Sequence, residues 1–245
     1  MGNTDENVWW VDYNDPSSYA KRYMQFMTAV RGYWREFKVI GLGLSKRHKM
    51  DGWVAGFLDH VTRNQKAKGP DYLSIHHYIG SAKGAHKDCG GAVDFNEDEY
   101  YASLKALSNY QADIDEHRRV IQQHTNPEHK TMICFDEWGL WHKEATSDNG
   151  TRQIQTLRDG IFAACAMHLF YRNSDIVEFA MQTQLANLLS SLFETDGACF
   201  YMTPTYYVFK LFKEHKGQYV ITTKLTEESD EMIDYISSIV LQLAS

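Results

Sequence analysis

The stretch Thr131-Met-Ile-Cys-Phe-Asp-Glu-Trp-Gly-Leu-Trp141 runs from an apolar segment directly into two carboxylates and two tryptophans. Its first five residues show no alternation of apolar and polar side chains, which is typical of a strand covered on both faces of a parallel sheet. Asp136 and Glu137 therefore lie where a buried strand meets the loop that follows it. Ligands bind at this end of the strands in open α/β sheets and in (β/α)8 barrels.

Two interpretations of this carboxylate pair fit the stretch alone. The acids could begin a loop and cap the turn that follows the strand. They could instead act on a ligand, and the neighbouring Trp138 and Trp141 favour this interpretation. Large amphipathic rings beside an acid are common where a sugar ring stacks on an aromatic face. We therefore predict a functional site at this strand end.

The composition indicates a globular protein that does not bind nucleic acid. The chain has 245 residues, of which 43% are apolar and 13% aromatic, and this is enough to bury a sizeable core. Its formal charge of -7 and its pI near 5.9 argue against a phosphate-binding surface, because such surfaces need clustered Lys and Arg. A neutral polar substrate fits this balance better.

The cysteines and the hydropathy pattern point to a reducing compartment. Cys89, Cys134, Cys165 and Cys199 lie far apart, so we expect free thiols. The residues His76, His77, His86 and Cys89 match no tetrahedral zinc spacing, and we expect neither a metal nor a cofactor. No apolar run approaches about 18 residues, and polar residues follow Met1, so we expect a cytoplasmic protein without a signal peptide or a membrane span.

Strand-like and helix-like segments alternate along the chain. Their spacing of about 30 to 55 residues is the βα pattern of a parallel sheet, and four strands are about half of an eight-stranded barrel. We expect strands near 37–43, 72–78, 131–135 and 176–183, and helices near 19–36, 51–66, 96–124, 151–171 and 204–216.

Polar and aromatic side chains gather at the ends of three expected strands. Parallel strands would bring them to one edge of the sheet, where they would suit the hydroxyl groups of a sugar. Each also has a plain alternative: a structural histidine, an amide that caps a strand end, or an aromatic ring in the core. These residues are Ser74, His76 and Tyr78, then Glu137 and Trp141, and finally Gln184 and Asn187.

Five stretches together resemble one enzyme family. They are residues 71–78 (DYLSIHHY), 94–101 (DFNEDEYY), 135–141 (FDEWGLW), 184–187 (QLAN) followed by 195–197 (TDG), and 203–212 (TPTYYVFKLF). In this order they resemble the C-terminal part of the catalytic barrel of glycoside hydrolase family 51, the α-L-arabinofuranosidases of clan A, from about Glu6 to Gly217. The resemblance implies an α/β fold, a partial (β/α)8 TIM-type barrel of about strands 4/5 to 8 over residues 1–217. Residues 218–245 would be a tail or the start of a truncated β-sandwich.

The resemblance also implies roles for individual residues. Glu137 would be the nucleophile, with His76 and Tyr78 beside it. Trp141, Gln184 and Asn187 would bind the arabinose. Counting back ten residues from the family-like element Pro16-Ser-Ser-Tyr-Ala20 places the general acid/base at Glu6. The pair reads Asp5-Glu6 where the family has Asn-Glu, so Asp5 would replace an Asn that binds the sugar hydroxyl next to the reacting carbon.

The implied chemistry is retaining hydrolysis of arabinan-type or arabinoxylan-type saccharides by two carboxyl groups about 5 Å apart. Three alternatives remain open. The chain could be a sugar-binding fragment without turnover, or one half of a split enzyme that needs a complementing chain or a homo-oligomer, because four strands of a barrel leave two unpaired edges. It could also be another clan A retaining glycosidase, such as an endoglucanase or a xylosidase.

Overall fold

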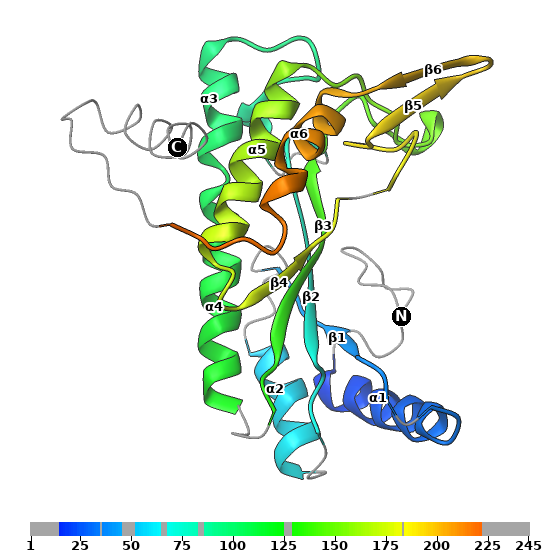
Figure 1. Cartoon of the computed structure of the whole chain (residues 1–245), viewed down its shortest axis with the longest axis vertical. Helices are drawn as coiled ribbons and strands as arrows, with labels where there is room; N and C mark the ends of the chain where they lie inside the picture. The colour runs from blue at the N-terminus through cyan, green and yellow to red at the C-terminus, as the bar shows by residue number, and fades with distance from the viewer. Residues whose placement is uncertain are drawn as a thin grey trace, which may run out of the picture. The chain divides into compact units, whose positions relative to one another are not determined.

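A computed structural model describes residues 15–34, 36–45, 52–64, 68–82, 86–124, 129–182 and 184–221. Four strands form one sheet in the order β1-β2-β3-β4, namely β1 (Ile40–Leu42), β2 (Tyr72–Ile79), β3 (Met132–Leu140) and β4 (Val177–Ala180) (Figure 1). β1 runs parallel to β2, with Ile40 opposite Tyr72. The expected α/β sheet of parallel strands with flanking helices is confirmed.

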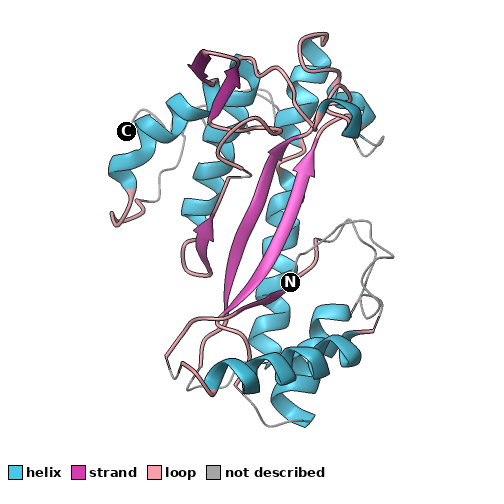
Figure 2. Cartoon of the chain, turned by 90° about the vertical axis from the view of Figure 1, so that its right-hand side faces the viewer, coloured by secondary structure: helices cyan, strands magenta, loops and turns pink. Residues whose placement is uncertain are grey.

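The two longest strands, β2 and β3, occupy the middle of the sheet (Figure 2). All eight residues of β2 are buried, and so are Ile133, Cys134 and Phe135 of β3. The main-chain N–H of Met132 donates to the carbonyl of Asp71, and that of Trp141 donates to Ile79. The residue numbers increase along both strands from the first hydrogen bond to the second, so β2 and β3 run in the same direction. The absence of alternation at Thr131–Phe135 therefore correctly indicated a strand covered on both faces.

Six α-helices lie in the described part of the chain. Three of them begin at a side chain that caps the first turn: Asp15 before α1, Asn96 before α3 and Thr203 before α6. The helices are α1 (Pro16–Arg31), α2 (Trp53–Asp59, continued by a π-helix His60–Asn64), α3 (Glu97–Lys105), α4 (Ser108–His124), α5 (Leu157–Arg172) and α6 (Pro204–Phe212).

Several predicted helix boundaries are wrong, and α1 ends at Arg31 rather than near residue 36. The single helix predicted over 96–124 is two helices, α3 and α4, separated at Ala106 and Leu107. The helix predicted from Thr151 begins only at Leu157, because Thr156 and Asp159 form a capping box that fixes its start. Ile154, which precedes this helix, and Leu157 at its first position are 65% and 75% exposed.

The structure contains an antiparallel hairpin after the sheet that was not predicted from the sequence. Its strands are β5 (Phe193–Asp196) and β6 (Cys199–Met202), with Phe193 opposite Met202. Gly197 takes a left-handed backbone conformation in the turn, with φ of 56°. The described residues also form 3-10 turns at Lys87–Cys89, Ser147–Asn149 and Lys213–His215.

The chain folds into two compact units, each with its own core. The first consists of the described residues up to His76 with Asn109–Asp136 and Ile176–Phe179, and the second of His77–Ser108, Glu137–Asp175 and the described residues from Ala180 onward. In the first, the rings of Tyr19 and Tyr23 pack on Phe57, with centroids 4.9 and 5.4 Å away. In the second, α5 packs on α6.

The boundary proposed near Gly217 stays a prediction, since residues 222–245 lie outside the described part. All four cysteines are free, and three of them are buried. None of the helices in the described ranges is long and apolar enough to cross a membrane.

Candidate functional site

The second unit brings Glu137 together with two other predicted site residues. Tyr78 near the end of β2 donates its hydroxyl hydrogen to Oε2 of Glu137 on β3, at 3.1 Å. The Tyr78 ring meets Trp141 edge to face, with centroids 5.5 Å apart. Tyr78 is only 4% exposed, whereas Glu137 and Trp141 are half-buried. The carboxylate is therefore oriented by a fixed phenol and stays within reach of a ligand.

The two tryptophans of the opening stretch have different surroundings. The indole N–H of Trp141 donates to the carbonyl of Ala145 at 2.9 Å, and its ring packs on a small apolar cluster of Tyr78, Ala145 and Leu189. Trp138 is fully buried, and its ring centroid lies 5.3 Å from that of Phe170. The suggestion that both rings face a sugar is wrong for Trp138, which is a core residue.

His76 lies in the first unit beside a carboxylate to which the sequence assigned no role. The hydroxyl of Ser74 is 2.8 Å from Oδ1 and 3.0 Å from Oδ2 of Asp136, and it can donate to either oxygen. Nε2 of His76 lies 3.5 Å from the same Oδ1. Ser74 and His76 are two residues apart on β2, so they share a face of the strand. The spacing along β2 predicts this shared face, whereas the carboxylate that both residues contact comes from β3.

Gln184 and Asn187 lie in a loop with an uncommon backbone. Both adopt left-handed conformations, with φ of 47° and 62°. The carboxamide of Asn187 donates to Oγ1 of Thr195 and accepts from the Thr195 main-chain N–H, each at 2.7 Å. Asn187 therefore fastens the loop to β5, while Gln184 is exposed. Their predicted contact with arabinose stays a prediction.

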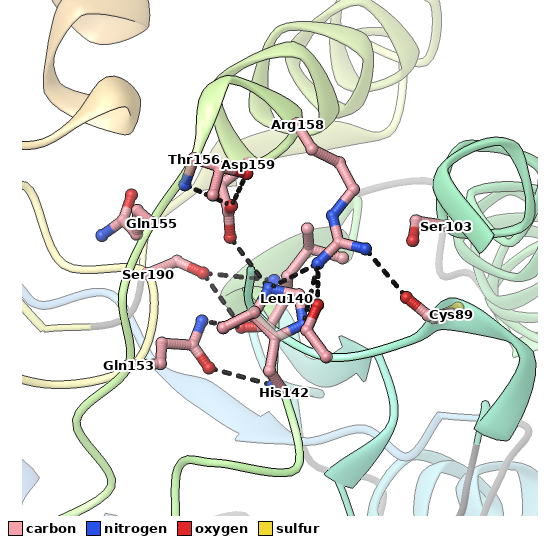
Figure 3. A network of polar contacts seen from close by, with 12 residues as sticks. Cys89, Ser103, Leu140, His142, Gln153, Gln155, Thr156, Arg158, Asp159 and Ser190 are labelled. Carbon is pink, nitrogen blue, oxygen red and sulfur yellow. Dashed lines mark hydrogen bonds and ion pairs between the residues drawn. The ribbon is translucent and has the colours of Figure 1, made fainter. Parts of the chain in front are cut away.

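A buried polar network supports the loops of the second unit (Figure 3). Arg158, only 2% exposed, donates from Nη1 to the Cys89 carbonyl at 2.8 Å and from Nη2 to the Gly91 carbonyl at 2.6 Å. Its guanidinium lies 3.7 Å from the centroid of the Phe95 ring. Burial lowers the pKa of Arg158, and the charge of Asp159 opposes this effect.

His142 and Asp159 complete this network. Nε2 of His142 lies 3.1 Å from Oδ1 of Asp159, and both side chains are fully buried. The other oxygen of Asp159 accepts from the main-chain N–H of Thr156 at 2.8 Å. The loop after β2, the loop after β3 and the start of α5 are thereby held together. Sequence reasoning missed Arg158 and Asp159, although Thr156-x-x-Asp159 was visible as a capping signal.

The predicted acid/base Glu6 and its neighbour Asp5 lie outside the described residues. The structure therefore gives no distance between Glu6 and Glu137. The acid/base role of Glu6 and the sugar-binding role of Asp5 stay predictions. Among the residues that the structure describes, no three His, Cys, Asp or Glu side chains are grouped as metal ligands would be.

The carboxylate Glu137 falls within a known family pattern. Residues 136–237 match the family model of the alpha-L-arabinofuranosidase C-terminal domain. This part of the chain is therefore similar to the C-terminal domain of alpha-L-arabinofuranosidases. The predicted resemblance is thus confirmed, and it extends over most of the chain in the comparisons with individual proteins.

Two curated arabinofuranosidases illustrate the extent of the similarity. An intracellular exo-alpha-L-arabinofuranosidase of Bacteroides ovatus is 29% identical over 223 residues, which are 89% of this chain and 41% of that protein. A probable alpha-L-arabinofuranosidase C of Aspergillus fumigatus is 30% identical over 212 residues, or 80% and 38% of the two chains. The chain thus spans about two fifths of the length of these arabinofuranosidases.

Solved structures show the same fold. The thermostable family 51 alpha-L-arabinofuranosidase from Thermotoga petrophila superposes with a TM-score of 0.68 at 24% identity, covering 89% of this chain and 40% of that one. The arabinofuranosidase from Xanthomonas axonopodis pv. citri gives 0.66 at 24% identity, covering 81% and 39%. These coverages are consistent with a partial α/β barrel.

Proposed function

We propose that this chain carries the nucleophile half of a retaining glycoside hydrolase, which releases terminal α-L-arabinofuranosyl residues from arabinan-type or arabinoxylan-type saccharides. The observation that supports this most is the hydrogen bond from Tyr78 to Glu137, because it orients a half-buried carboxylate at the end of a parallel strand. Trp141, packed on Tyr78, supplies an aromatic wall beside that carboxylate.

In the proposed reaction, a carboxylate oxygen of Glu137 attacks the anomeric carbon and forms a covalent glycosyl ester. The bond to the leaving oxygen breaks, and Glu6 gives that oxygen its proton. Glu6 then takes a proton from water, whose oxygen attacks the anomeric carbon and releases Glu137 with net retention. His76, Gln184, Asn187 and Asp5 would bind the sugar hydroxyl groups around this centre.

The setting of the enzyme is also part of the proposal. We place it in the cytoplasm, which is supported by the relative from Bacteroides ovatus that is described as intracellular and by the four free cysteines. The two edges of the four-stranded sheet would be covered by further polypeptide, either a complementing chain or another copy of this one.

Hydrolysis of 4-nitrophenyl α-L-arabinofuranoside by the native full-length gene product tests the proposal. We expect Glu137→Gln to reduce turnover by about a thousandfold or more, because the amide cannot form the glycosyl ester. Glu214→Gln is the matched control and should keep full activity. Glu214 is an exposed carboxylate whose ion pair in the described residues is with its neighbour Lys213.

Three results would overturn the assignment. Undiminished hydrolysis by Glu137→Gln would remove the nucleophile. Thermal stabilisation by arabinose without turnover in the wild type would favour a sugar-binding fragment. Faster hydrolysis of aryl xylosides or cellobiosides than of the arabinofuranoside would favour another retaining glycosidase of clan A.

A further inference from the structure

The first unit contains a compact arrangement of a serine, a histidine and an aspartate. Ser74, His76 and Asp136 come from the neighbouring strands β2 and β3. The side chain of His76 is 9% exposed and that of Asp136 is 21% exposed. The Ser74 hydroxyl lies within 3.0 Å of both Asp136 oxygens, which limits rotation of the carboxylate. Asp136 therefore presents Oδ1 to Nε2 of His76 from a restrained position.

This contact decides the hydrogen-bonding character of the imidazole ring. A carboxylate only accepts hydrogen bonds, so the contact is favourable when Nε2 of His76 carries the hydrogen. In the neutral ring, Nδ1 must then be an acceptor, and it becomes a donor only in the cation. An aspartate behind a histidine thus determines what the opposite nitrogen can offer to a ligand or a neighbour, as acids behind functional histidines commonly do.

Two titratable groups near His76 and Asp136 are uncharged, so Asp136 is the charge that acts on His76. Burial, and then the charge of Asp136, raise the pKa of Cys134 on β3 to about 12, so its thiol is neutral. Burial lowers the pKa of His117 on α4, whose Nε2 lies beside Gly43, the residue after β1. This histidine is therefore neutral as well. Neither group opposes the effect of the carboxylate on His76.

We propose that Asp136 is a positioning residue that fixes the hydrogen of the His76 imidazole on Nε2 and orients the ring, with Ser74 holding the carboxylate in place. The inference rests on the proposed function in one respect, since it matters for catalysis only if His76 serves the arabinofuranosidase site. The placement of the hydrogen itself is independent of turnover.

Nitrogen NMR of the full chain labelled with ¹⁵N-histidine measures this placement directly. His76→Gln identifies the His76 signals by their loss. In the wild type near neutral pH, we expect Nε2 to have the chemical shift of a hydrogen-bearing nitrogen. Asp136→Ala removes the acceptor, so the Nε2 shift should move toward an average of both tautomers.

Three further variants separate the charge of Asp136 from its capacity to accept the hydrogen on Nε2 of His76. Asp136→Asn keeps an oxygen that can accept from Nε2, so the tautomer should persist while the ring loses its proton at a lower pH than in the wild type. Asp115→Asn removes an exposed carboxylate of α4, whose described partner is Gln111, and should leave the His76 signals unchanged. Ser74→Ala should move the Nε2 chemical shift of His76 less than Asp136→Ala does. It provides a second, milder test in case Asp136→Ala fails to fold.

The outcomes distinguish this inference from the proposed function. A hydrogen-free Nε2 in the neutral wild-type ring, or unchanged His76 signals in folded Asp136→Ala, overturns the role of Asp136. Inactivity of the wild type toward arabinofuranosides overturns the proposed function without altering the NMR result. With an active wild type, Asp136→Asn should lower kcat about tenfold and shift the acidic limb of the pH profile, whereas Asp115→Asn should change neither.

Discussion

At the scale of single residues, His168 is a buried base at a position without catalytic assignment. It lies on α5 and is 7% exposed, with its ring 5.1 Å from Phe212 between centroids. In the described part of the chain, its Nε2 finds no hydrogen-bond acceptor or donor. Burial, followed by the positive charges of Arg172 and His215, lowers the pKa of His168 to about 4.

This lowered pKa predicts a loss of stability in mild acid. The unfolded chain binds a proton at His168 below about pH 6.5, whereas the folded chain resists protonation until about pH 4, so the free energy of unfolding falls as pH drops through this window. We expect His168 to account for roughly 2 kcal/mol of the fall, measured by urea denaturation at pH 7 and pH 4.5.

His168→Leu provides the comparison. The variant should lose less stability than the wild type between the two pH values, because leucine cannot be protonated. His117, whose pKa burial also lowers, remains in both proteins and keeps part of the slope. Equal losses in the wild type and the variant would show that His168 does not resist protonation in the folded state.

At the scale of elements, the first turn of α5 fixes the loops around it. Arg158 and Asp159 are both only 2% exposed, and the negative charge of Asp159 stabilises the charged form of this buried guanidinium. A buried charge that loses its partner is strongly destabilising. Asp159→Ala should therefore cost about 3 kcal/mol or more of unfolding free energy, because it also removes the cap on Thr156 and the contact with His142.

Urea unfolding at pH 7 measures this cost. Asp148→Ala is the matched control, because Asp148 is an exposed aspartate of the preceding 3-10 turn and should change stability by less than about 0.5 kcal/mol. Similar midpoints for the two variants would contradict a structural role for the network. Glu137 is untouched in both proteins, so any change in activity would come from the supporting loops.

The elements differ in how far the sequence could predict them. The four parallel strands were predictable because segments such as Met132–Phe135 are continuously apolar. The hairpin was missed because Phe193–Asp196 is short and entirely polar after Phe193, although Asp196-Gly197 is a recognised turn signal. In the site, Glu137, Tyr78 and Trp141 follow from strand ends. The role of Asp136 depends on a contact across two strands, which residue spacing along one strand does not contain.

At the scale of the whole molecule, a net charge of -7 favours solubility, but one hairpin strand opposes it. All four residues of β6 are exposed, including Phe200 at 61% and Tyr201 at 54%. Exposed apolar edge strands promote association. We expect the isolated chain to sediment increasingly as dimers or larger species as its concentration rises, and we expect Phe200→Lys to reduce this association.

Sedimentation velocity over a hundredfold concentration range measures the effect, with Tyr33→Lys as the control. Tyr33 is 86% exposed near the end of α1, so this control adds the same charge at an aromatic residue in the other unit. Equal association of both variants would place the contact elsewhere, for example at the sheet edges.

The two carbonyl contacts of Arg158 also limit how this scaffold can be re-engineered. One guanidinium clamps Cys89 and Gly91 from the loop after β2 while it sits in the first turn of α5 beside His142 from the loop after β3. If one of these loops were replaced by the loop of another glycosidase, the buried guanidinium of Arg158 would lose the carbonyl oxygens to which it donates. Chimeras that aim at a new substrate should therefore exchange both loops and the helix start as a single cassette.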